Sequence, residues 1–99
     1  MASEIRLRPR ARADLGEIFA YSIERWSVSR ADRYILALTA GMEAVTRSPD
    51  LGRAIEGIEP PIRSYAVASH LIVCRSTPRG IDVVRVLHRR MDVVSRIQS

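Results

Sequence analysis

Two short apolar segments, HLIVCR at residues 70–75 and IDVVRVL at residues 81–87, constrain the fold more than any other feature of the sequence. They are rich in β-branched residues and almost continuously hydrophobic, whereas a strand with one face in water would alternate between apolar and polar residues. Such segments predict strands that are covered on both faces. We therefore expect a central sheet with other parts of the chain, or a bound partner, over each face.

A third segment, IRSYAV at residues 62–67, has the same character, and the connectors 68–69 and 76–80 have hairpin lengths. These strands are expected to form a three-stranded antiparallel meander. If each hairpin is centred on its turn, one face carries Arg63, Tyr65, Ile72, Cys74, Val83 and Arg85, and the other carries Arg75, Asp82 and His88. A slip of one residue in either hairpin would exchange the faces, so this assignment depends on the register.

The first half of the chain has a helical period instead. Residues 4–8 predict a short strand, Pro9 suits the first turn of a helix that runs through Trp26, and a second helix runs from a capping-box-like pair, Ser29 and Asp32, to Ser48-Pro49. The short link predicts an antiparallel αα-hairpin. The expected apolar stripes are Leu15, Ile18, Phe19, Ser22 and Trp26 on the first helix, and Ala31, Tyr34, Ile35, Leu38, Met42 and Val45 on the second.

The remaining segments complete an α+β fold. Residues 48–61 contain three prolines and two glycines without periodicity, which predicts a loop, and Met91, Val94 and Ile97 allow a short C-terminal helix. At 99 residues the chain is expected to form one domain, 1–99. One helical hairpin covers only one face of the sheet. The C-terminal segment could cover part of the other face, but a bound partner is the more economical candidate, since an exposed apolar face would be an association site.

The charge pattern points to partners with negative charge. All sixteen basic residues are arginine and the formal net charge is +5. Arginine makes paired hydrogen bonds to carboxylates and phosphates, so an acidic protein or a nucleic acid would fit, although genomic base composition also explains arginine-only usage. Aromatic residues make up only 5% of the chain and most of them are explained by the helix stripes, so direct nucleic-acid binding is not indicated.

Several classes of protein are disfavoured. No apolar run approaches the roughly 18 residues of a membrane span, the N-terminus lacks the apolar stretch of a signal peptide, and the single cysteine, Cys74, excludes an internal disulfide, so we expect a cytoplasmic protein with no membrane partner. Cys74 lies in an apolar run and is interpreted as a small buried residue. No HExxH motif, Gly-rich phosphate loop or carboxylate cluster occurs, so no metal or cofactor is expected.

The basic sequence His88-Arg89-Arg90 ends the last predicted strand and has two interpretations. Acid-base cleavage of RNA needs a proton acceptor, a proton donor and cations, which His88 and its arginines could supply. Neither histidine lies in a catalytic motif, however, so His70 and His88 are interpreted as structural and no catalytic residue is assigned. Asp14 and Glu17, with Arg10 and Arg12 nearby, are interpreted as surface ion pairing.

The order of motifs along nearly the whole chain resembles the ParE toxins of the RelE/ParE superfamily. The residues that carry the resemblance are Arg8-Pro9-Arg10-Ala11, Ala13-Asp14-Leu15, Ile18, Tyr21, Glu24-Arg25-Trp26, Ala31 through Tyr34, Ser48-Pro49-Asp50-Leu51-Gly52-Arg53, Arg63-Ser64, Ser69-His70-Leu71-Ile72 and Val84-Arg85-Val86-Leu87-His88-Arg89-Arg90-Met91-Asp92. Each motif is moderately specific, and their collinear order is more so.

This resemblance implies a toxin of a type II toxin-antitoxin pair. It implies a ParD-like antitoxin, which binds operator DNA through its N-terminal part and wraps the toxin with its C-terminal segment, and DNA gyrase as a target that is inhibited by binding. The alternative is a RelE-like ribosome-dependent mRNA endonuclease. The chain departs from that branch because Arg89 stands after His88, where several ribonucleases have an aromatic residue, and because lysine is absent.

With that resemblance, two groups of residues are candidates for contact. The target-binding candidates are Arg85, His88, Arg89, Arg90 and Met91, at the end of the last strand. The antitoxin-binding candidates are Trp26, Tyr34, Arg63, Tyr65, Ile72 and Arg75. The basic end is accordingly interpreted as a contact surface and not as an active site.

Overall fold

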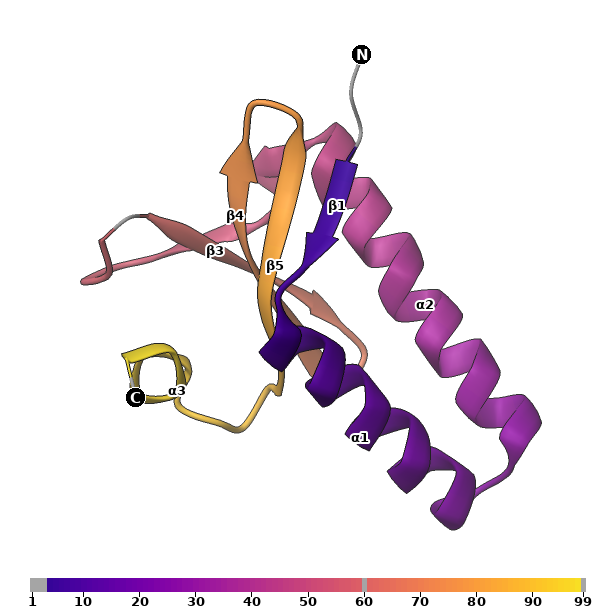
Figure 1. The fold of residues 1–99 in the computed structure, drawn as a ribbon. Helices are drawn as coiled ribbons and strands as arrows, with labels where there is room; N and C mark the ends of the chain where they lie inside the picture. Colours follow the sequence, from indigo (N-terminus) through magenta and orange to yellow (C-terminus); the bar gives the residue numbers. More distant parts are fainter. Residues whose placement is uncertain (1–3, 60, 99) are drawn as a thin grey trace.

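The predicted α+β architecture is confirmed by a computed structural model that describes residues 4–59 and 61–98. The elements follow in the order β1 (Glu4–Leu7), α1 (Pro9–Arg25), α2 (Val28–Arg47), the 3-10 turn η1 (Pro49–Leu51), β2 (Arg53–Ile55), β3 (Ile62–Val67), β4 (His70–Thr77), β5 (Gly80–His88) and α3 (Val93–Gln98) (Figure 1). The N-terminal strand, the helical hairpin, the meander and the short C-terminal helix therefore all occur where the sequence predicts them.

The strands form one five-stranded sheet in the order β1-β5-β4-β3-β2. The meander β3-β4-β5 is antiparallel, as predicted, while β1 pairs with β5 in parallel. The predicted loop 48–61 is wrong in one respect, because β2 lies within it and pairs with β3 from Arg53↔Ser64 to Ile55↔Ile62. A strand of three residues is too short to show a period in the sequence.

The two long helices begin and end close to the predicted residues. Pro9 stands at the start of α1, and α2 ends at Arg47 with Ser48 as its C-cap. The predicted capping-box pair Ser29 and Asp32 is wrong, because the N-cap of α2 is Ser27, whose side chain accepts a hydrogen bond from the Arg30 N–H at 3.1 Å. Ser27 has the extended backbone that a cap requires, whereas Ser29 is already helical.

Helices α1 and α2 cover one face of the sheet (Figure 1). The core on this side includes Leu38, Met42, Val45, Ile72, Cys74, Ile81, Val83 and Val86, so the predicted stripe of α2 is confirmed. On α1, Leu15 and Ile18 pack against this core, whereas Trp26 is 50% exposed at the C-cap. Close approach of α2 to the sheet depends on Gly41, because a Cβ there would lie 2.6 Å from Val67 Cγ2.

The opposite face of the sheet is covered by the chain's own apolar residues. Ile62, Val73 and Leu87 are buried there, packed against Ile55, Ile58, Leu71, Val93 and Ile97. Helix α3 lies on this side, away from the helical hairpin (Figure 1). The expectation that a partner is the more economical cover is therefore wrong at this position, because α3 and the segment after β2 supply the apolar contacts.

A β-bulge in the β4-β5 hairpin changes the faces of two residues. Val73 pairs with Arg85 but Cys74 pairs with Val83, so β5 advances two residues where β4 advances one. Beyond the bulge, Arg85 lies opposite Val73, on the face away from the helices, and His88 lies opposite His70, on the helical face. The predicted faces of Arg85 and His88 are therefore exchanged, since one extra residue inverts the alternation.

Candidate partner-binding site

A groove with a volume of about 940 Å³ lies between α1, α2 and the ends of β4 and β5. Its apolar wall is made by Ile18, Tyr21, Trp26 and Ala37. The tip of the helical hairpin projects past the sheet (Figure 1), so the last turns of α1 have no strand to pack against. Tyr21 and Trp26 consequently remain 59% and 50% exposed, and they form a half-open aromatic wall.

The floor of the groove is a cluster of three rings that are distant in sequence. Tyr34 Oη lies 2.7 Å from His70 Nδ1 and also accepts the Ser69 N–H at 3.1 Å. His70 and His88 are cross-strand partners, and their rings meet edge to face with centroids 5.4 Å apart. Sequence reasoning treated the two histidines separately, because pairing them requires a register that the bulge shifts by one residue.

The rim of the groove is predominantly cationic. Arg30 stacks over the Trp26 ring at 4.8 Å from its centroid, and Arg33 also lines the groove, while Glu17 is the acidic residue in its lining. Burial lowers the pKa of His70, the neighbouring His88 lowers it further, and Asp14 acts in the opposite direction. The floor therefore favours a neutral His70 when the groove is empty.

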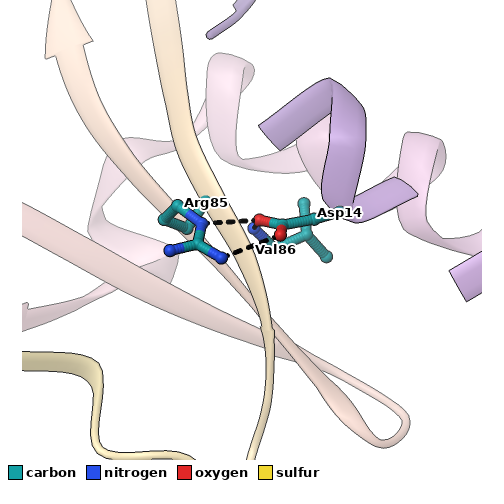
Figure 2. Close-up of polar contacts among 3 residues, drawn as sticks. All are labelled: Asp14, Arg85 and Val86. Carbon is teal, nitrogen blue, oxygen red and sulfur yellow. Dashed lines mark hydrogen bonds and ion pairs between the residues drawn. The ribbon is translucent and has the colours of Figure 1, made fainter. Parts of the chain in front are cut away.

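A buried ion pair fixes the strand that leads to this floor (Figure 2). Arg85 donates to both carboxylate oxygens of Asp14, from Nε at 2.8 Å and from Nη2 at 2.9 Å, and the Val86 N–H donates to the same carboxylate at 2.9 Å. Each charged side chain is only 12% exposed. The interpretation of Asp14 as a surface ion-pairing residue is wrong, because its partner lies 71 residues away on β5.

The position of Asp14 follows from where β1 ends. The strand β1 pairs with β5 only as far as Leu7↔Val83, so the edge of β5 is open beyond that point. Helix α1 starts there and brings the Asp14 carboxylate to the Val86 N–H, which β1 no longer reaches. The hydrogen bonds that Arg85 donates to Asp14 raise the pKa of Arg85 above its ordinary value. Arg85 is thus held within the fold, although the sequence groups it with the basic end.

The rest of the basic end is open to solvent. Arg89 and Arg90 are exposed, and Met91 is 40% exposed. Arg89 is positioned by hydrogen bonds to the backbone, from its N–H to Ser69 O at 2.9 Å and from Nη1 to Ala68 O at 3.3 Å. Among residues 4–59 and 61–98, neither arginine has a carboxylate within ion-pairing distance.

The antitoxin-binding candidates do not form one surface. Trp26 and Tyr34 line the groove, whereas Ile72 is fully buried beneath the helices and Tyr65 is packed against the same core. Arg63 donates to Gly52 O at 2.7 Å. On the opposite face lies Arg75, whose buried Nε has no hydrogen-bond partner among the described atoms.

Two further sequence interpretations have definite outcomes. Asp82 is an ion-pair partner of Arg8, at 3.6 Å, and of Arg6, at 4.0 Å. The ion pair between Asp82 and Arg75 that the sequence allowed does not form. Cys74 is buried, as predicted, and burial raises the pKa of its thiol to about 11. Its thiolate is therefore scarce near neutral pH. In the described part of the chain, no three potential ligands among His, Cys, Asp and Glu are placed to hold a metal.

Comparison with known proteins identifies the family of the chain. Residues 5–93 match the family described as "ParE toxin of type II toxin-antitoxin system, parDE". The chain is 42% identical over 94 residues to "Toxin ParE1" of Mycobacterium tuberculosis, covering 94% of this chain and 96% of that protein. It is 37% identical over 87 residues to "Toxin ParE1" of Caulobacter vibrioides, covering 88% and 90%.

A solved structure, "Chromosomal ParDE TA system from P. aeruginosa", has the same fold. It superposes with a TM-score of 0.73, covering 89% of this chain and 96% of that one at 16% identity. Within the described residues, no helix combines the length and the apolar character needed to cross a membrane. The fold has therefore already been seen in a solved toxin-antitoxin system.

Proposed function

The chain belongs to the ParE toxins of type II toxin-antitoxin systems, and from this membership we propose that it arrests growth by binding DNA gyrase without catalysis. A ParD-like antitoxin neutralises it by docking in the groove between α1 and α2. In this proposal residues 1–99 act as a single toxin domain, and the protein works in the cytoplasm. Operator DNA is reached through the antitoxin and not through direct contact.

The half-exposed aromatic wall of the groove is the observation that carries this proposal. An amphipathic helix that docks in a groove needs apolar contacts flanked by charges that match its polar face. Tyr21 and Trp26 supply exposed aromatic surface, which is the kind of residue that contributes most to protein-protein binding. Arg30 and Arg33 supply positive charge for an acidic partner. Free of a partner, this surface would leave two large rings in water.

The target is proposed to meet the basic end. Arg89, Arg90 and Met91 are exposed and follow directly from the rigid sheet, and His88 connects them to the floor of the groove. Arg85 is proposed to act differently, because its guanidinium is engaged by Asp14. It would position the end of β5 for the residues that follow it. An antitoxin seated in the groove would lie beside this target-binding end.

The first experiment tests the target. The purified toxin is incubated with gyrase and supercoiled plasmid, and in parallel with ribosomes translating a labelled message. We expect gyrase-dependent DNA cleavage and intact message. A toxin that leaves gyrase unaffected in this assay would contradict the proposed target, whatever happens to the message.

Cleavage of mRNA is the second candidate function, because the structure brings His70 and His88 together. Two imidazoles with ring centroids 5.4 Å apart, beside Arg30 and Arg33, include the groups that acid-base cleavage of RNA requires. The same parallel assay separates the candidates. Cut message that disappears in His88→Gln, with unaffected gyrase, would favour the nuclease.

A second experiment tests the groove. Trp26→Ala removes an exposed ring from the wall, and we expect antitoxin binding to weaken about thirtyfold, which corresponds to a hot-spot contribution of about 2 kcal/mol. The matched control is Leu36→Ala, because Leu36 is 66% exposed on α2 but does not line the groove. Equal affinity in the two variants, measured by calorimetry, would place the antitoxin elsewhere.

A further inference from the structure

The floor of the groove offers two hydrogen-bond donors side by side. His88 Nδ1 accepts the Arg90 N–H at 3.2 Å, so neutral His88 carries its proton on Nε2. Tyr34 Oη accepts the Ser69 N–H, which leaves its own proton to donate to His70 Nδ1. We assign the proton of neutral His70 to Nε2 on this basis.

Neither Nε2–H has an acceptor among residues 4–59 and 61–98. Among the described residues no hydrogen bond reaches Nε2 of His70 or of His88, although both rings line the groove. A donor in an open groove without a protein partner is satisfied by water, which a ligand with a suitable acceptor can replace. The two Nε2–H groups can therefore donate hydrogen bonds to a ligand in the groove. They are separate from its aromatic wall.

The charges around the pair favour an anionic acceptor. From α2, Arg30 and Arg33 line the groove together with the Tyr34 hydroxyl. From α1, Glu17 lines it, while the Asp14 carboxylate is committed to Arg85 and Val86. Arg89 and Arg90 follow His88 on the chain. The cations thus outnumber the available carboxylates.

We propose that His70 and His88 together bind a side-chain carboxylate of the antitoxin, carried by an acidic residue that is flanked by apolar ones. The flanking apolar groups pack on Tyr21 and Trp26, and Arg33 stands at the rim for further acidic residues. This inference rests on the proposed docking of the antitoxin in the groove and specifies the chemistry of the segment that docks.

The arrangement makes binding depend on pH. In the empty groove, burial and the neighbouring His88 lower the pKa of His70. A carboxylate beside the pair favours the protonated imidazole and raises that pKa. Binding therefore takes up a proton, and affinity increases as the pH falls from the bound-state pKa toward the free-state pKa. Each unit by which the carboxylate raises the pKa makes the protonated toxin bind about tenfold more tightly than the neutral toxin.

The test is calorimetric titration of the toxin with the co-expressed, separated ParD-like antitoxin at pH 6 and pH 8. We expect tighter binding at pH 6, with proton uptake shown by heats that differ between buffers of different ionisation enthalpy. The double variant His70→Gln, His88→Gln keeps an N–H donor at each position but cannot titrate. We expect it to bind with no difference between the two pH values.

Two outcomes would overturn the inference while leaving the antitoxin docked. One is equal affinity of the wild-type toxin at both pH values, and the other is a pH dependence that persists in the double Gln variant. Arg79→Gln, at the distant β4-β5 turn, controls for loss of positive charge or general perturbation. The proposed docking has a separate test, because unaltered affinity of the Trp26→Ala toxin for the antitoxin would contradict it.

A small probe tests the two histidines in the wild-type toxin, without the antitoxin and without a substitution. The wild-type toxin is titrated with 3-phenylpropionate, and with 3-phenylpropionamide as the neutral match, while the two imidazoles are followed by NMR. We expect only the carboxylate to shift the signals of both histidines and to raise the titration midpoint of His70. Identical shifts with the amide, or none with the carboxylate, would overturn the proposal.

Discussion

Arg85 and Arg89 are four residues apart on one strand and its continuation, yet their environments are opposite. The Arg85 side chain is 12% exposed and binds the Asp14 carboxylate with two hydrogen bonds, whereas the Arg89 side chain is exposed and donates to the backbone oxygen of Ala68. In the sequence they form one basic cluster. The structure divides that cluster into an internal ion pair and an open surface.

The difference shows how one residue type performs two tasks at the end of a strand. A buried guanidinium must be paired, so Arg85 contributes to holding α1 on the open edge of β5. An exposed guanidinium contributes little to stability and stays available to a partner. Stability and function should therefore respond separately to substitutions at the two positions.

Removing the Asp14 carboxylate should have the largest effect on stability. Asp14→Ala leaves the Arg85 charge and the Val86 N–H buried without an acceptor. We expect the free energy of unfolding to fall by about 3–5 kcal/mol, measured by urea denaturation. Glu24→Ala, an exposed acidic position on the same helix, should change it by less than about 0.5 kcal/mol. Similar losses in both variants would show that the pair is no more stabilising than surface charge.

Changing only the shape of the cation should have an intermediate effect. Arg85→Lys keeps the charge, but an ammonium group cannot reproduce the paired bonds to Oδ1 and Oδ2 of Asp14. We expect a loss of about 1–2 kcal/mol in the same measurement. Arg89→Lys is the matched substitution on the open side and should be neutral. A neutral Arg85→Lys would mean that charge alone maintains the contact with α1.

The pH dependence of stability should show a smaller effect that belongs to the groove. The pKa of His70 is lowered in the folded state from its ordinary value of 6.5, so the unfolded chain binds a proton first as the pH falls. This contribution to stability is present above the unfolded value and decreases as the pH falls from there toward the folded pKa. We expect His70→Gln to flatten the profile as the pH falls below 6.5. An unchanged profile would show that His70 does not cause the pH dependence of stability.

Reversing charge on the open side should have the smallest effect on stability and a large effect on function. Arg89→Glu with Arg90→Glu should change the free energy of unfolding by less than about 0.5 kcal/mol. Growth arrest on induction should nevertheless be lost, because the proposed target-binding surface changes sign. Arg79→Glu, with half this charge change at the β4-β5 turn, should remain toxic. Full toxicity in the double variant would remove the basic end from target binding.

Much of this molecule could be predicted from local patterns. The apolar runs at 70–75 and 81–87 indicated buried strands, and the three- and four-residue spacing from Ala31 to Val45 indicated the buried side of α2. The very short strand β2 and the Ser27 cap were missed, because each depends on a few residues whose signal is weak beside that of their neighbours.

The candidate site was predicted less completely than the fold. The sequence selected Trp26, Tyr34 and His88 for contact, and all three line one groove, but it did not connect them with His70. It also placed Asp14 on the surface. Both errors concern pairs that are far apart in the chain and meet only when the sheet register is known.

The sequence by itself determined the period of each segment, and with it the α+β order, the helical hairpin and the antiparallel meander. Only the tertiary structure decided which side chains meet. One extra residue at the β5 bulge places Arg85 opposite Val73 and His88 opposite His70. The early end of β1 brings Asp14 to Val86. Hydrophobic periodicity is a local property of the chain, whereas register and strand ends are fixed by contacts between residues far apart in it.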